Sequence, residues 1–268
     1  MISTPPRPGQ LPVTVDPDRF GGLARLYGRD ALEKLARTRC TVIGAGGVGS
    51  WIVEALARSG IGRLTLVDLD DVCITNTNRQ VPALEGEYGR PKIDVLAERV
   101  ERINPACDVT RRHAFFTEAT AAELIDPQSG FVVDAVDRMT PKALIVARAR
   151  ELGLDALTIG GAGGRRDPTR IRVGDLGATS GDMLLRLVRK KLRRSHGWPA
   201  GKGCVMGVTA VYSNEPQVYP WSNGDVCATA EPGSNLHMDC ASGFGAASFV
   251  TGAFGFAAAA EIVRRIVE

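Results

Sequence analysis

One stretch, residues 40–70, limits the folds open to this chain more than any other. An apolar run leads into a glycine cluster, a helical pattern follows, and a second apolar run ends in acidic residues. Gly44, Gly46 and Gly49 fit the spacing G-x-G-x-x-G between a strand and a helix. This order predicts a strand–turn–helix–strand unit whose turn can approach a phosphate closely, in front of a helix N-terminus.

The turn predicts a nucleotide site without saying which nucleotide binds, because NAD, FAD and ATP sites all use it. Asn76 and Arg79 follow the second apolar run, and Lys92 opens the next helical pattern. Cationic side chains neutralise phosphate oxygens, so this set favours a triphosphate over a dinucleotide. Asp137, at the end of a later apolar run, suits Mg²⁺, which prefers carboxylate and phosphate oxygens.

Apolar runs alternate with helical patterns throughout residues 40–160. Further strands are predicted at 107–111, 131–137 and 156–159, and further helices at 30–38, 92–103, 117–125 and 141–152. The alternation predicts an α/β fold with a Rossmann-like, doubly wound and mainly parallel sheet. From about residue 165, short strands and glycines predict a C-terminal extension packed on that sheet. Ligands bind such sheets at the carboxyl ends of the strands.

Length and composition fit one ordinary domain. We expect the 268 residues to form a single domain, with a flexible proline-rich arm at 1–18. The six cysteines form no C-x-x-C pair, and no signal-peptide pattern opens the chain, so we expect a reduced, cytoplasmic protein. Residues 243–260 carry no charge, but four glycines interrupt them. A buried helix or a helix at a dimer interface is therefore favoured over a membrane span.

Taken in order, these motifs resemble the ATP-dependent adenylating (ThiF-type) superfamily, which includes ubiquitin-activating enzymes and the bacterial activators of molybdopterin and thiamine sulfur carriers. The likeness rests on the glycine turn, Asp68-Leu-Asp70, Asn76-Thr-Asn-Arg79, Lys92 and Asp134-Ala-Val-Asp137. Within the superfamily the chain is similar to the tRNA threonylcarbamoyladenosine dehydratases. That closer similarity rests on residues 19–28, 75–79, 160–164 and 238–245.

The resemblance implies a role for each motif. The turn (Gly44, Gly46, Gly47 and Gly49) would approach the ATP phosphates, and Asp68 would bind the ribose with Asp70 beside it. Asn76, Arg79 and Lys92 would contact the triphosphate, and Asp137 would ligate Mg²⁺. Relatives also lend an arginine to the partner subunit's ATP from the segment before the first strand. Here strict alignment places Gly22 at that position, and Arg25 or Arg19 stands in for it.

The implied activity is the ATP-dependent dehydration of N6-threonylcarbamoyladenosine in tRNA, next to the anticodon, through a carboxyl-adenylate. The alternative is adenylation of the C-terminal glycine of a sulfur-carrier or ubiquitin-like protein. Enzymes of that branch use two C-x-x-C pairs for zinc, which Cys204, Cys227 and Cys240 cannot make, so no zinc is expected. An NAD-dependent oxidoreductase and a non-catalytic nucleotide-binding protein are disfavoured by Arg79 and Lys92. A catalytic cysteine, a monovalent cation and a cysteine desulfurase or sulfur-acceptor partner stay open.

A basic run near residue 190 predicts a nucleic-acid partner despite a net charge of only +3. Four apolar residues between 184 and 188 lead into the run, which indicates an amphipathic helix with a basic face. Such a face suits a phosphate backbone, and tRNA fits. The candidate RNA-binding residues are Arg186, Arg189, Lys190, Lys191, Arg193 and Arg194.

Overall fold

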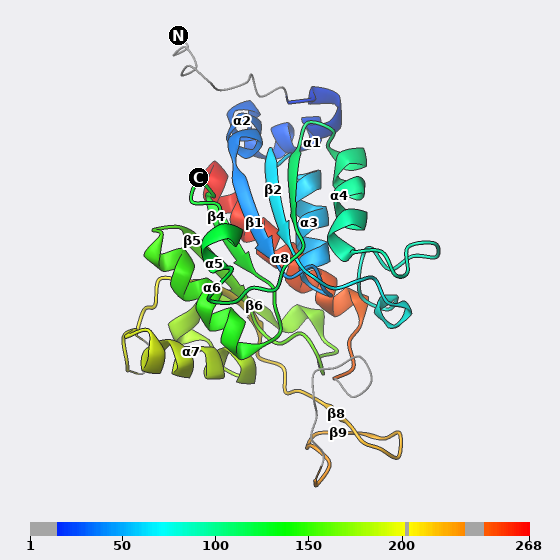
Figure 1. The fold of residues 1–268 in the computed structure, drawn as a ribbon, viewed down its shortest axis with the longest axis vertical. Coiled ribbons are helices and arrows are strands. Elements are labelled where there is room, and N and C mark those ends of the chain that lie inside the picture. Colours follow the sequence, from blue (N-terminus) through cyan, green and yellow to red (C-terminus); the bar gives the residue numbers. More distant parts are fainter. Residues whose placement is uncertain (1–14, 202–203, 234–243) are drawn as a thin grey trace.

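A computed structural model describes residues 15–201, 204–233 and 244–268. A single sheet of seven strands, in the order β3-β2-β1-β4-β5-β7-β6, runs through these residues (Figure 1). The strands are β1 (Arg39–Ile43), β2 (Arg63–Val67), β3 (Asp108–Arg112), β4 (Phe131–Asp134), β5 (Asp155–Ile159), β6 (Ile171–Asp175) and β7 (Thr209–Ser213), with β8 (Tyr219–Pro220) and β9 (Val226–Cys227) forming a separate pair. The helices are α1 (Pro17–Tyr27), α2 (Arg29–Arg37), α3 (Gly49–Arg58), α4 (Lys92–Ile103), α5 (Ala121–Leu124), α6 (Met139–Glu151), α7 (Met183–Ser195) and α8 (Ser248–Val267).

The central strands are parallel, as the alternating pattern predicts. β1 pairs in parallel with β2 and β4, β4 with β5, and β5 with β7, whereas β6 is antiparallel to β7. The parallel strands therefore end on one side of the sheet, which we call the carboxyl edge. Successive side chains point to opposite faces, so Val42 and Leu66 join the core under α3, α4 and α8, while Ile43 and Val67 join the core under α5, α6 and α7.

The predicted elements between 40 and 160 are present, with two corrections. The strand expected at 131–137 ends at Asp134, because the buried Lys142 side chain bonds the Asp134 and Val136 carbonyl oxygens and turns the chain there. The helix expected at 117–125 shrinks to the four residues of α5, since Thr117 and Thr120 bond each other and the local backbone in a turn.

The start of the chain also differs from expectation. Most of the expected arm, residues 1–14, lies outside the described residues. Pro17 and Asp18 belong to α1 instead, because the Asp16 side chain accepts the Asp18 and Arg19 amides and Pro17 occupies the first helical turn.

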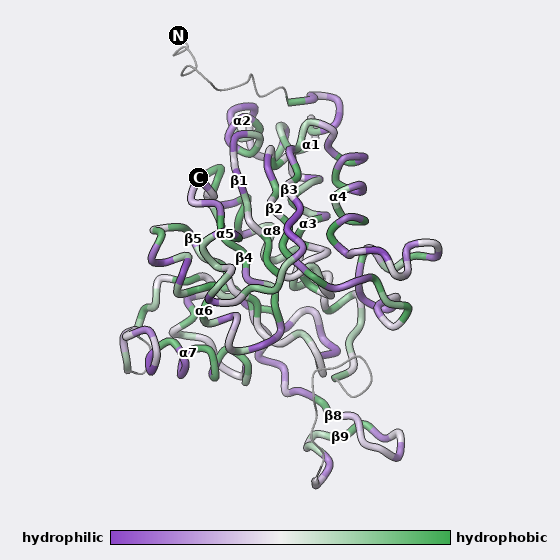
Figure 2. Tube along the Cα trace, in the orientation of Figure 1, coloured by the Kyte–Doolittle hydropathy of each residue, from purple (hydrophilic) through white to green (hydrophobic). Residues whose placement is uncertain are grey.

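The C-terminal part is more than an extension lying on the sheet, since it contributes β6 and β7 to it. In Figure 2 the colour of α7 alternates between hydrophobic and hydrophilic, which matches its burial of Leu185, Val188 and Leu192. The β8–β9 hairpin projects away from the rest of the molecule (Figure 1).

The uncharged stretch at 243–260 largely forms α8, a helix buried against α3. Gly255 permits this approach, because a Cβ there would lie 2.6 Å from the Trp51 Cβ and 3.1 Å from the Val48 carbonyl oxygen. The prediction of a buried helix is confirmed within the chain itself. No helix among the described residues is long and apolar enough to cross a membrane.

Candidate active site

The glycine turn joins β1 to α3 at the carboxyl edge, and its glycines have two different roles. Gly44 has φ +93°, and a Cβ there would lie 2.9 Å from the Ala135 carbonyl group; a Cβ on Gly49 would lie 1.8 Å from the Gly44 oxygen. These two glycines shape the turn itself. Around Gly46 nothing lies within 4 Å of a Cβ position, so the fold leaves space there for a bound group.

Asp68 braces this turn from the end of β2. Its Oδ2 accepts the Ala45 amide at 2.6 Å, and its Oδ1 accepts the Asp70 amide at 2.8 Å. Burial raises the pKa of Asp68, although both amides and the nearby Lys92 oppose the rise. Asp68 thus positions the turn, and its predicted contact with a ribose stays a prediction.

Lys92 and Asp70 form an ion pair at the same edge. The Lys92 side chain is 7% exposed and places Nζ 2.8 Å from Oδ2 of Asp70, whose own side chain is 58% exposed. The Lys92 ammonium is therefore held in place by a carboxylate that is free to rotate away from it toward solvent. A phosphate oxygen is a suitable replacement partner for Lys92.

Arg79 lies over the turn. A Cβ on Gly47 would lie 3.6 Å from Arg79 Cδ, and the guanidinium donates to the Thr75 carbonyl oxygen at 2.8 Å and to the Asn78 side chain at 2.9 Å. The structure thus brings Arg79 and the turn together, as predicted. Asn76 is buried and has a bracing contact: its side-chain oxygen accepts the Cys73 amide at 3.1 Å.

Asp137 is exposed in the loop after β4, two residues beyond the Ala135 carbonyl that touches the Gly44 position. Sequence reasoning missed what supports this loop. Lys142 on α6 is fully buried and donates to Oδ2 of Asp134 at 2.9 Å, and Thr158 donates to the same carboxylate at 2.6 Å. A lysine on a helix usually indicates a solvated face, so only the spacing from Asp134 hinted at this role.

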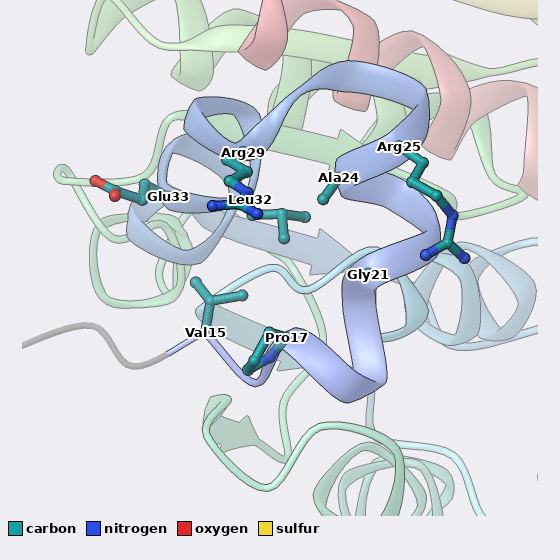
Figure 3. Close-up of a pocket in the computed structure, with 8 residues that line it drawn as sticks. All are labelled: Val15, Pro17, Gly21, Ala24, Arg25, Arg29, Leu32 and Glu33. Carbon is teal, nitrogen blue, oxygen red and sulfur yellow. The ribbon is translucent and has the colours of Figure 1, made fainter.

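Arg25 does not lie near the turn of its own chain. α1 packs at the carboxyl end of α3, where Phe20 lies 3.5 Å from the Gly60 Cβ position, whereas the turn is at the amino end of α3. The ten residues of α3 separate the two by roughly 15 Å. Figure 3 shows Arg25 on the side of α1 that faces away from Leu32 and Val15.

The basic helix α7 is present, but its six predicted RNA-binding residues are not equivalent. Arg189 donates to the Leu176 carbonyl and to Thr179, and Arg193 donates to the Pro199 and Gly201 carbonyls. These two guanidinium groups fasten α7 to neighbouring loops. Within the described residues, the other four side chains make no hydrogen bond to a neighbouring loop; Arg186, Lys190 and Arg194 are exposed, and Lys191 is half-buried.

Comparison with known proteins decides the family. A model described as the ThiF family matches residues 21–268. This chain belongs to the ThiF family. A ThiF-family relative, the tRNA threonylcarbamoyladenosine dehydratase of Escherichia coli (strain K12), is 47% identical over 252 residues, covering 93% of each chain. The protein of the same name from Haemophilus influenzae (strain ATCC 51907 / DSM 11121 / KW20 / Rd) is 42% identical over 250 residues, covering 93% of this chain and 94% of the relative.

A solved ThiF-family structure confirms the fold. The crystal structure of E. coli tRNA N6-threonylcarbamoyladenosine dehydratase, TcdA, in complex with ATP matches with a TM-score of 0.82 and 41% identity. The match covers 93% of this chain and 94% of that one. The Rossmann-like α/β prediction is therefore confirmed over nearly the whole chain, extension included.

Proposed function

We propose that this chain is an ATP-dependent tRNA threonylcarbamoyladenosine dehydratase that acts as a single adenylating unit. The observation that carries the proposal is similarity to proteins of that name along 93% of the chain. The site agrees with it, because an open glycine turn, Arg79 and Lys92 meet at one edge of the sheet. One similar structure is a complex with ATP, and we assign ATP to the same turn here.

The reaction needs two chemical steps. The threonyl carboxylate attacks the α-phosphate of ATP, a P–O bond breaks, and pyrophosphate leaves. The carbamoyl group of the same nucleoside then attacks the acyl-adenylate carbonyl and displaces AMP, which closes a ring. The net change in the nucleoside is the loss of one water. The protein's contribution is positioning and charge stabilisation.

Cations at the carboxyl edge supply the stabilisation. Lys92 exchanges Asp70 for phosphate oxygens, and Arg79 approaches them from above the turn. Both positive charges oppose the negative charge that builds up as pyrophosphate departs. Asp70, once released, is free to accept a ribose hydroxyl alongside Asp68.

Mg²⁺ fits this site through Asp137. No three His, Cys, Asp or Glu side chains in the described ranges group closely enough to hold a metal ion. Nucleotide-bound Mg²⁺ needs only one or two carboxylates, because phosphates and waters complete its shell. Asp137, exposed beside the turn, would hold the ion, which would offset charge on the phosphates.

The arginine that completes the site comes from a second copy of the chain. Arg25 is exposed and distant from its own turn, and Leu26 and Tyr27 beside it are 69% and 42% exposed. Exposed apolar side chains next to a cation suit a subunit contact. Arg25 is also among the residues that line a pocket of about 540 Å³ between α1 and α2 (Figure 3).

Mixed dimers test the shared site. Arg25→Ala and Lys92→Ala homodimers should both be nearly inactive, whereas mixing them and allowing subunit exchange should restore about a quarter of normal activity, because half the dimers are mixed and each carries one intact site. Absence of recovery after verified exchange would mean that Arg25 does not act across subunits.

One assay tests the proposed function. The protein is incubated with ATP and tRNA that carries threonylcarbamoyladenosine, and the digested nucleosides are analysed by mass spectrometry. We expect loss of one water from the modified nucleoside, with AMP and pyrophosphate formed in equal amounts. Formation of an adenylate on a small carrier protein instead, with no change in the tRNA, would establish the alternative. Co-purification tests the cysteine desulfurase or sulfur-acceptor partner that the resemblance implies.

A further inference from the structure

Arg165 is a buried cation with few partners among the described residues. Its side chain belongs to a residue only 3% exposed, and Nη2 donates to the Gly181 carbonyl oxygen at 3.2 Å. Nε and Nη1 are buried and have no hydrogen-bond partner in the part of the chain that the structure describes. Leaving charged donors unpaired in the interior is costly, and burial accordingly lowers the pKa of Arg165.

The two carboxylates whose charges act most on Arg165, those of Asp182 and Glu215, accept hydrogen bonds from backbone amides instead. Asp182 accepts the Gly161 amide with one oxygen and the Leu185 amide with the other, both at 2.9 Å. Glu215 accepts the amides of residues 166 and 167 at 3.1 Å. Their charges partly offset the burial of Arg165, yet neither carboxylate makes an ion pair with it within 4.0 Å. The guanidinium thus has charge compensation but vacant donors.

Arg165 stands at the edge where the reaction would take place. It follows the glycine cluster 160–164 at the carboxyl end of β5, and β5 lies two places from β1 in the sheet. Neighbouring strands are about 4.8 Å apart, so the end of β5 is about 10 Å across the sheet from the ATP-binding turn. A substrate that lies across the ends of β4 and β5 with its carboxylate at the turn would therefore come near Arg165.

Among the described residues, Gln217, Val218 and Phe244 cover the cluster. The Val218 amide donates to Gly164 at 2.9 Å, Gln217 Nε2 donates to Gly163 at 3.0 Å, and the Phe244 ring lies 5.4 Å from that of Tyr219. These noncovalent contacts lie on the residues directly before Arg165, so the inference requires that they open.

We infer that Arg165 binds an oxyanion of the tRNA substrate after this layer moves aside, an inference that rests on the proposed function. A guanidinium suits two oxyanions that the substrate carries, the threonyl carboxylate of the modified adenosine and a backbone phosphate. Arg165 is then a substrate-binding residue at β5, separate from the cations that serve ATP at β1 and β2.

The test compares Arg165→Met with Arg166→Met, its exposed neighbour with the same loss of charge. The first measurement is the Tm of each ligand-free protein. The second is the Kd for two probes: the free nucleoside threonylcarbamoyladenosine, which has the carboxylate and no phosphate, and an unmodified tRNA transcript, which has phosphates and no such carboxylate. Cyclisation by the unsubstituted protein is measured alongside.

Arg165→Met should keep or raise the Tm, because it removes unpaired buried donors. It should also raise the Kd for one of the two probes at least tenfold. Weaker nucleoside binding identifies the carboxylate, and weaker transcript binding alone identifies a phosphate. Arg166→Met should leave the Tm and the nucleoside affinity within experimental error. A Tm lowered by several degrees, failure of Arg165→Met to fold, or both Kd values within twofold of normal would overturn the inference. If Arg165 governs nucleoside binding but no cyclisation occurs, the proposed function fails and the site stands.

Discussion

Two cations buried near the carboxyl edge, Lys142 under β4 and Arg165 after β5, are treated differently by the fold. Lys142 donates to three acceptors, the Asp134 carboxylate and the carbonyl oxygens of Asp134 and Val136. Within the described ranges Arg165 donates to a single acceptor, the Gly181 carbonyl oxygen. A buried charge that is fully paired holds the structure together, whereas one that is left under-paired costs stability that a ligand can recover. The three bonds of Lys142 therefore indicate a structural role, whereas the vacant donors of Arg165 are the feature on which the proposed substrate contact rests.

The largest expected effect concerns the fully paired cation. Lys142→Met leaves Asp134 charged and buried without its partner, so the free energy of unfolding should fall by about 3–5 kcal/mol. Urea denaturation measures it. Adding Asp134→Asn to Lys142→Met should return part of this loss, because the unpaired charge is gone. A loss below about 1 kcal/mol for Lys142→Met would break the comparison with Arg165.

Next come the charged side chains at the glycine turn. Arg79→Ala, Lys92→Ala and Asp137→Ala should each slow cyclisation roughly a hundredfold, or about 3 kcal/mol, because each removes a charge that we propose stabilises the transition state. tRNA affinity and the far-ultraviolet circular dichroism spectrum should stay unchanged. An Asp137→Ala protein that cyclises at the normal rate would show that Mg²⁺ is held elsewhere.

On α7 the comparison can be made within one helix. Lys190→Ala with Arg194→Ala should weaken tRNA binding about tenfold at low salt and reduce the slope of log K against log salt by about 2. Arg189→Ala, which cuts the links to Leu176 and Thr179, should lower the Tm and leave that slope unchanged. Filter binding at several salt concentrations, with thermal melts, separates the two. Equal salt slopes for both proteins would contradict the division of α7 drawn above.

The smallest expected effect is on the pH dependence of stability, through the ion pairs of Glu54 on α3 with Arg58 on α3 and Arg99 on α4. Burial alone would raise the pKa of Glu54, but hydrogen bonds from Arg99 and Arg58 outweigh it and hold that pKa below its usual value. Because the folded pKa is depressed, this contribution is present above the unfolded pKa of about 4.3 and is lost as pH falls through the folded value. Glu54→Gln should remove about 1 kcal/mol near pH 7 and flatten the loss of stability below pH 4.3. If the free energy of unfolding of Glu54→Gln falls below pH 4.3 as steeply as that of the unsubstituted protein, Glu54 does not contribute in this way.

The sequence predicted the first part of the molecule much better than the second. α4 occupies the predicted residues 92–103, since Ile93, Leu96 and Val100 recur at helical spacing and report a local preference. β6 exposes Arg172 and Val173, so it lacks a clear apolar pattern, and it pairs antiparallel with β7, a long-range choice that no local pattern records. Likewise the positions of Arg189 and Arg165 depend on loops distant in sequence, so composition marked them as basic without saying which neighbours they meet.

The contact between α8 and the nucleotide loop has a consequence for how the enzyme is made. Thr251 donates to the Arg79 carbonyl oxygen across 172 residues, and Asn78 donates to the Ala246 carbonyl across 168. On the ribosome, residues 40–160 can therefore pair their strands early, while the loop that carries Arg79 waits for α8 to emerge from the exit tunnel. A nascent chain would therefore order its first strands before the loop that carries Arg79 gains these two contacts.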